Sequence, residues 1–141
     1  MCEPLLQVRD LKQYFRISGG YTVRAVDGVS FDIYPGETYG LVGESGSGKS
    51  TIGRSIIRLY EPTAGQILFE GTDISGKLNK QTTQLLRTQM QMIFQDPMAC
   101  LNPRKKVGEI IGEGLDIHHL YKTREERKEK IDTILAKVGL A

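Results

Sequence analysis

A run of glycine and serine residues ending in a lysine and a serine carries the clearest chemistry in this 141-residue sequence. Residues 43–50 read GESGSGKS, which matches the pattern G-x-x-x-x-G-K-[ST] at every fixed position. The glycines of such a run allow a tight turn whose backbone N–H groups point inward and form a concave anion site. The lysine supplies positive charge for the β- and γ-phosphates of a nucleotide, and the serine hydroxyl is a ligand for Mg²⁺. The spacing therefore predicts a P-loop that binds phosphate groups.

The flanking sequence places this loop between a strand and a helix, as phosphate binding by such a loop requires. Residues 39–42 predict an apolar strand, and Ile52, Ile56 and Leu59 recur at helical spacing and predict a helix over 50–60. The start of that helix directs the positive end of its dipole at the phosphates. The predicted nucleotide-binding residues of the loop are Gly43, Glu44, Ser45, Gly46, Ser47, Gly48, Lys49, Ser50 and Thr51.

Two other patterns point to different nucleotides, and each has a simpler interpretation. Residues 40–46 have the spacing G-x-x-G-x-x-G of a dinucleotide-binding turn, but the Lys-Ser pair downstream favours a nucleoside triphosphate. Residues 73–76 and 79–82 are similar to the DxxG and NKxD elements of GTPases. However, Thr82 stands where guanine recognition needs a carboxylate, and the two elements lie too close together. We interpret these two segments as a turn and the start of a helix.

Hydrolysis needs more than a P-loop, because a carboxylate must hold Mg²⁺ and another group must orient water. Residues 92–96 (MIFQD) come closest to an apolar strand that ends in an acid, but Gln95 interrupts the run before Asp96. No later segment supplies such a strand. The sequence therefore predicts a chain that binds ATP without hydrolysing it efficiently.

Composition indicates a folded domain and excludes several classes of protein. Hydrophobic residues make up 39% and charged residues 26%, which excludes a disordered chain. The net charge of +2 gives no support for a nucleic-acid partner. No apolar run approaches the roughly 20 residues of a membrane helix. The N-terminus has no signal-peptide pattern, and the two cysteines, Cys2 and Cys100, fit a reducing cytoplasm.

Strand patterns dominate up to residue 96, and helical patterns follow. A glycine turn at 18–20 predicts a hairpin, and Thr123 and Gly139 suit the start and end of the last helix. Strands are expected over 5–11, 22–26, 29–33, 38–42, 66–69 and 90–94, and further helices over 79–88, 107–118 and 123–138.

Three segments resemble ABC transporter ATP-binding subunits: VRAVDGVSF at 23–31, the P-loop at 43–51 and GQILFEG at 65–71. FQDP at 94–97, followed by LNPR at 101–104, is similar to the oligopeptide and dipeptide importer branch; a related nickel importer branch shares much of this pattern. The resemblance covers essentially the whole chain.

This resemblance implies a P-loop NTPase core, with a RecA-like parallel sheet and an antiparallel β subdomain, over 1–96. It implies the start of a helical subdomain over 97–141. The family's signature and Walker B elements would lie beyond Ala141. Its switch histidine would lie there too, and His118 and His119 do not match that position.

The resemblance also implies roles for residues outside the loop. Gln95 matches the Q-loop glutamine, which contacts Mg²⁺ and the attacking water in this family. The resemblance thus implies that Gln95 and Lys49 are the catalytic residues of this chain. The alternative interpretation of Gln95 is a polar residue that ends a strand. An aromatic side chain upstream of the P-loop stacks on adenine in this family. Phe15 is the first choice by its position, Tyr14 the second and Tyr21 the third, although each also fits packing within the hairpin.

For the intact subunit, the resemblance implies head-to-tail pairing with a second ATP-binding subunit. Hydrolysis of Mg·ATP would drive uptake of oligopeptides or dipeptides through integral-membrane permease subunits, at the cytoplasmic face of the membrane. This sequence departs from the family at Cys100, where a small hydroxyl residue is usual, and at Met98-Ala99, which replace a more polar or aromatic pair. Rival interpretations are a non-catalytic nucleotide-binding or assembly fragment and a small P-loop kinase with the helix 123–138 as its lid.

Overall fold

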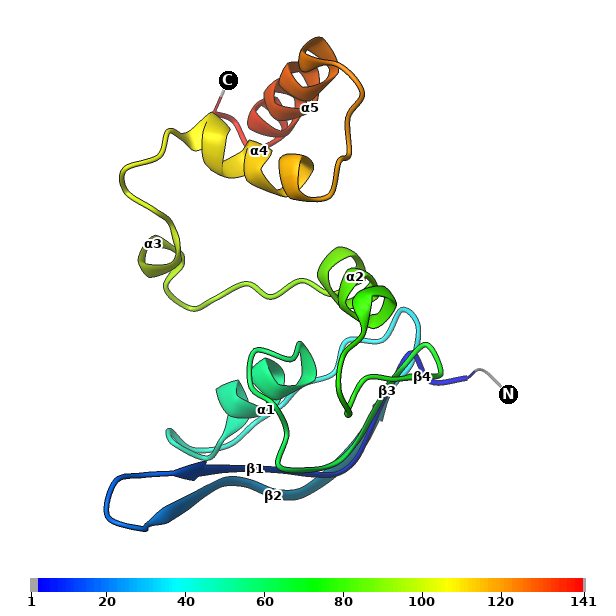
Figure 1. Ribbon diagram of the computed structural model, residues 1–141, viewed down its shortest axis with the longest axis vertical. Coiled ribbons are helices and arrows are strands. Elements are labelled where there is room, and N and C mark those ends of the chain that lie inside the picture. Colours follow the sequence, from blue (N-terminus) through cyan, green and yellow to red (C-terminus); the bar gives the residue numbers. More distant parts are fainter. Residues whose placement is uncertain (1–2, 141) are drawn as a thin grey trace. The chain divides into compact units, whose positions relative to one another are not determined.

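The computed structural model describes residues 3–140, which divide into two compact units, one up to Met92 and one from Ile93 onward. Figure 1 labels the elements along the chain. The first unit contains β1 (Leu6–Arg16), β2 (Thr22–Ile33), α1 (Lys49–Ile56), β3 (Ala64–Phe69), β4 (Thr72–Asp73) and α2 (Lys80–Gln89). The second contains α3 (Pro97–Cys100), α4 (Val107–Ile117) and α5 (Arg124–Lys137).

An antiparallel sheet with the strand order β2–β1–β3–β4 is the base of the first unit. β1 and β2 form the predicted hairpin, with Arg16 paired to Thr22 beside the turn. Gly19 and Gly20 both have positive φ, which glycine adopts without steric cost. The two strands predicted over 22–26 and 29–33 are one continuous strand, β2.

One face of this sheet is covered by α1, which packs against β1 and β2. A buried hydrogen bond joins the two layers, because the Ser55 hydroxyl of α1 donates to the Gln13 side chain of β1 at 3.4 Å. The sheet and both helices also contribute apolar side chains to one buried cluster. The buried core consists of Leu6, Val8, Leu11, Val26, Ile52, Ile67, Phe69, Ile74 and Leu86.

The helix after the loop is shorter than predicted: it ends at Ile56, not at Tyr60. Arg58 adopts a φ of +58°, which ends the helical path. The N–H groups of Leu59 and Tyr60 both donate to the carbonyl of Arg54, at 2.9 and 3.2 Å. The predicted apolar stripe is therefore incomplete, since Leu59 is exposed.

Two segments expected as strands, 38–42 and 90–94, are not strands in the structure. The side chains of Val42 and Ile93 are 93% and 96% exposed. A strand needs a hydrogen-bonded neighbour, and within residues 3–140 neither segment has one. The sheet that the structure describes is thus wholly antiparallel, and the predicted parallel sheet is not formed by these residues. The α/β class and the antiparallel β subdomain are confirmed.

In the second unit, α4 packs against α5 through an ion pair. The Arg127 guanidinium donates to both carboxylate oxygens of Asp116, at 2.6 and 2.7 Å. These hydrogen bonds lower the pKa of Asp116 to about 2. The predicted cap of α5 is present, since the Thr123 hydroxyl accepts from the Glu126 N–H at 3.2 Å. Across residues 3–140, no helix has the length and apolar character needed to span a bilayer.

Candidate functional site

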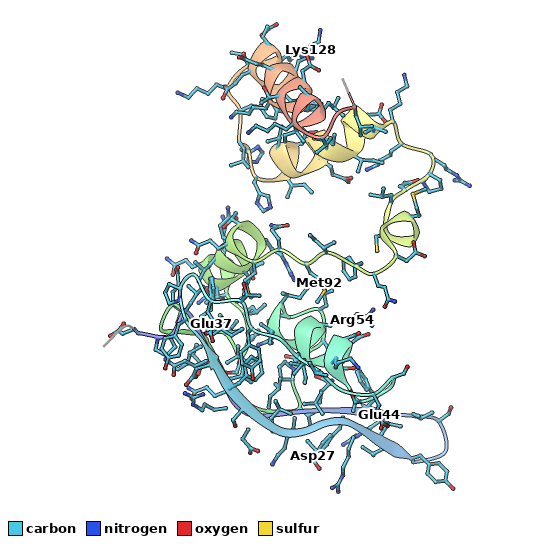
Figure 2. All side chains as sticks on the ribbon, turned by 180° about the vertical axis from the view of Figure 1, so that it is seen from behind. Asp27, Glu37, Glu44, Arg54, Met92 and Lys128 are labelled. Carbon is cyan, nitrogen blue, oxygen red and sulfur yellow. The ribbon has the colours of Figure 1, made fainter. Side chains whose placement is uncertain are left out.

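The 43–51 loop turns tightly, as its glycine content predicts. Gly46 and Gly48 have φ values of +83° and +90°, a region that side-chain-bearing residues rarely adopt. The N–H of Ser47 donates to the carbonyl of Glu44 at 3.2 Å and closes the turn between them. Figure 2 shows Glu44 on the loop that leads into α1.

Close packing against backbone requires glycine at 48, whereas the near contact at Gly43 is with a side chain that can rotate. A Cβ at Gly48 would lie under 3.0 Å from the carbonyl oxygen of Ala25 in β2. A Cβ at Gly43 would lie 2.6 Å from the Ser47 hydroxyl oxygen. By contrast, a Cβ at Gly46 would meet nothing within 4 Å. The loop is therefore pressed against β2 at Gly48 and open at Gly46.

The start of α1 presents backbone donors that the helix itself does not use. Gly48 is the N-cap residue and has no side chain to cap the first amides. In a helix the N–H groups of the first turn, here from Lys49 to Thr51, have no carbonyl partner within the helix. The first turn also contains no acidic residue. These amides and the positive end of the helix dipole suit an anion.

The ammonium group of Lys49 lies within the loop. Its Nζ donates to the carbonyls of Gly43 and Glu44, at 2.7 and 2.6 Å, and lies 3.4 Å from the Ser47 hydroxyl. The loop thus holds a positive charge against its own carbonyl groups. A phosphate group bound there would be within reach of Lys49 and of the amides of α1 together.

Ser50 fits a magnesium ligand in the form that P-loops use. It follows Lys49 in the first turn of α1, and its hydroxyl is exposed. Mg²⁺ prefers oxygen ligands and is usually held by one or two protein groups, with phosphates and waters completing its shell. No group of three or more His, Cys, Asp or Glu side chains suited to a metal ion occurs in the described part of the chain. Ser50 fits a magnesium ion that arrives with a nucleotide.

The three aromatic candidates for adenine differ in their surroundings. Phe15 is half-buried, and its ring meets the Tyr60 ring edge to face, with centroids 5.2 Å apart. The Tyr14 hydroxyl donates to Asp27 at 2.5 Å, which raises the pKa of Tyr14, and the Arg24 guanidinium lies over its ring. Tyr21 is 76% exposed beside the hairpin turn. Phe15 is the candidate whose ring is packed against the segment that follows α1.

Gln95 lies in the second unit, whereas the P-loop lies in the first. Its side chain is exposed. The predicted catalytic role of Gln95 therefore stays a prediction. Met98 and Cys100, where the sequence departs from the family pattern, are also exposed.

Arg54 and Tyr60, which connect the loop helix to Phe15, belong to no motif of the sequence. Arg54 lies on α1 (Figure 2), and its guanidinium is 3.3 Å from the Tyr60 hydroxyl oxygen and 5.9 Å from the centre of the Tyr60 ring. The only signal in the sequence is an arginine six residues before an aromatic residue, a spacing without a known structural meaning. The turn that brings the two together begins at Arg58.

Comparison with known proteins identifies a family. Residues 26–141 match the family described as ABC transporter. The chain is 56% identical over 140 residues to the oligopeptide transport ATP-binding protein OppF of Bacillus subtilis, covering 99% of this chain and 46% of that protein. It is 52% identical over 144 residues to AppF of the same organism, also an oligopeptide transport ATP-binding protein, covering 98% and 44%. The chain thus spans less than half the length of these two curated relatives.

Solved structures agree on the fold. The dimeric ATP-binding cassette MJ0796 bound to ADP and Pi superposes with a TM-score of 0.80 at 23% identity, over 93% of this chain and 56% of that chain. The cassette cbiO1 from Clostridium perfringens, part of the cbiONQ complex, gives a TM-score of 0.71 at 25% identity, over 98% and 51%. The resemblance drawn from the sequence is confirmed by these matches.

Proposed function

The chain belongs to the ABC transporter family, and from this premise we propose that it is the nucleotide-binding part of an importer's ATP-binding subunit. The observation that carries the proposal is the position of Lys49. Its ammonium lies against the carbonyls of Gly43 and Glu44, beside the uncapped amides of α1. A positive charge beside several N–H donors that the helix does not use makes a site for the phosphates of ATP.

Each loop residue has a distinct part in this binding. The backbone amides of the loop bind the phosphate oxygens, and Lys49 moves from the loop carbonyls to the β- and γ-phosphates. Ser50 would hold the magnesium ion, which neutralises phosphate charge when it is bound. Phe15 stacks on the adenine ring. Gln95 is proposed to orient the attacking water and to contact the magnesium ion.

The chain's own residues do not complete a hydrolytic site. The sequence contains no apolar strand that ends in Asp-Glu. We therefore propose that this chain binds Mg·ATP without efficient turnover. In the intact subunit, residues 1–96 would form the β subdomain and P-loop core, and residues 97–141 the start of the helical subdomain.

The proposed partners and location follow from the relatives. Two of them are named as oligopeptide transport ATP-binding proteins, and MJ0796 is described as dimeric. We propose that the intact subunit pairs head to tail with a second such subunit and binds integral-membrane permease subunits at the cytoplasmic face of the membrane. Its hydrolysis of ATP would drive the uptake of oligopeptides or dipeptides.

Calorimetric titration of Mg·ATP into the chain tests this proposal. Lys49→Ala should abolish the measured heat, because the site loses its one ammonium. Lys80→Ala is the matched control: it removes a lysine from the exposed start of α2 in the same unit and should leave the affinity unchanged. Equal affinities for the unsubstituted chain and for Lys49→Ala would refute the P-loop as the site. Robust turnover that is lost in Lys49→Ala would refute the claim of inefficient hydrolysis.

A further inference from the structure

We infer that Tyr60 is a positioning residue that fixes the Phe15 ring at a set distance from the phosphate loop. The inference rests on the proposed function, because it takes Phe15 as the side chain that stacks on adenine. Tyr60 lies outside the P-loop pattern and follows the end of α1 by four residues. Three sets of contacts give it this role.

The first contact is between the two rings. The Phe15 and Tyr60 centroids are 5.2 Å apart, with the ring planes at 83°. Edge-to-face pairs of this kind are favourable because the positive edge of one ring meets the negative face of the other. The contact restricts the orientation of the half-buried Phe15 ring.

The second set of contacts joins Tyr60 to the helix that carries the loop. The Tyr60 N–H donates to the Arg54 carbonyl at 3.2 Å, and the Arg54 guanidinium donates to the Tyr60 hydroxyl at 3.3 Å. The same guanidinium lies 5.9 Å from the Tyr60 ring centre, within the range of a cation–π interaction. Arg54 lies on the same eight-residue helix as Lys49 and Ser50, so these contacts attach Tyr60 to the helix that carries the phosphate-binding residues.

The third set joins the segment after Tyr60 to β1 beside Phe15. The Thr63 N–H donates to the Lys12 carbonyl at 2.8 Å, and the Thr63 hydroxyl accepts from the Tyr14 N–H at 2.9 Å. Tyr60 is thus held between α1 and the part of β1 that contains Phe15. The contacts form a continuous connection from the phosphate loop to the proposed base-stacking ring.

A fixed Phe15 ring raises the binding affinity only for ligands that have both a base and phosphates. Loss of the Tyr60 ring frees Phe15 to leave its stacking position, and ordering it again on binding weakens the affinity for ATP. Inorganic tripolyphosphate has no base, so its affinity does not depend on Phe15. The ratio of the two affinities therefore separates a positioning role from general damage to the fold.

The test is calorimetric titration of the full chain with Mg·ATP and with Mg·tripolyphosphate. We expect Tyr60→Leu to weaken ATP binding by about two- to tenfold, the range of one aromatic pair, and to leave tripolyphosphate binding unchanged. Tyr60→Phe keeps the ring contact and should restore most of the ATP affinity. Phe31→Leu is the control, because it removes a different aromatic pair, that of Phe31 with Tyr39 at 5.0 Å, and should change neither affinity.

The outcomes separate this inference from the proposed function. If Tyr60→Leu weakens the binding of both ligands equally, or changes neither affinity, the positioning role is overturned while the P-loop site stands. Failure of the unsubstituted chain to bind either ligand would overturn the proposed function itself. If Tyr60→Leu does not fold, Arg54→Met provides the second variant, since it keeps both rings and removes the group that holds Tyr60. We expect Arg54→Met to weaken the binding of ATP alone, and an equal loss of affinity for tripolyphosphate would contradict the inference.

Discussion

Replacing Gly48 by alanine tests how the phosphate loop is held against the sheet. Gly48 has a φ of +90°, and a Cβ there would lie under 3.0 Å from the Ala25 carbonyl oxygen. Gly46 has a nearly equal φ of +83°, but a Cβ there would meet nothing within 4 Å. The two substitutions therefore share the backbone strain and differ in the clash with β2.

The magnitudes follow from these two contributions. Placing alanine at a left-handed φ costs about 1–2 kcal/mol, and this cost applies to both positions. The clash at Gly48 adds about 1–3 kcal/mol, because a backbone carbonyl cannot rotate away as a flexible side chain can. We therefore expect Gly48→Ala to be less stable than Gly46→Ala by about 1–3 kcal/mol, a large part of the stability of a small domain.

Urea denaturation followed by circular dichroism measures this difference. The free energy of unfolding is compared for the unsubstituted chain, Gly46→Ala and Gly48→Ala, with the slope against urea checked for equality. Equal losses of stability in the two variants would show that the loop does not approach Ala25, and this reasoning would then be refuted.

The remaining predictions concern the ion pair between α4 and α5. The pKa of Asp116 is lowered from 3.8 to about 2 by the hydrogen bonds from Arg127, so the pair stabilises the fold above the ordinary carboxyl pKa and loses its effect as the pH falls towards 2. Between pH 3.8 and 2, the helical circular-dichroism signal should fall less in Asp116→Asn than in the unsubstituted chain. An acid transition that is identical in the two proteins would contradict the role of this carboxylate. A Cβ at Gly112 would lie under 3.0 Å from the Arg127 guanidinium, whereas one at Gly114 would meet nothing within 4 Å. In an NMR titration Gly112→Ala should therefore raise the pKa of Asp116 towards 3.8, and Gly114→Ala should not; an unchanged titration in Gly112→Ala would count against the packing described here.

Local signals in the sequence predicted the parts of the structure that depend on neighbours in the chain. The pattern at 43–51 predicted the turn and the helix start, and Thr123 predicted the first residue before α5. The helix over 107–118 was predicted despite three glycines, and α4 forms over nearly that range. Each of these features is determined within a few residues.

Features that depend on distant residues were not predicted. The pattern requires glycine at Gly48, but the approach of the Ala25 carbonyl is visible only in the fold. The contact between Phe15 and Tyr60 joins residues 45 positions apart and follows from the turn at Arg58. The segments 38–42 and 90–94 were predicted as strands from their local apolar pattern, which cannot tell whether a strand has a hydrogen-bonded neighbour.

Amide NMR of the isotopically labelled chain during addition of Mg·tripolyphosphate tests the phosphate site most directly. We predict that the largest shifts fall on the amides of 44–51, where the loop and the start of α1 present their N–H groups, and that the amides of α4 and α5 stay unchanged. Shifts that leave 44–51 unaffected, or that fall only in the helices of the second unit, would contradict the account.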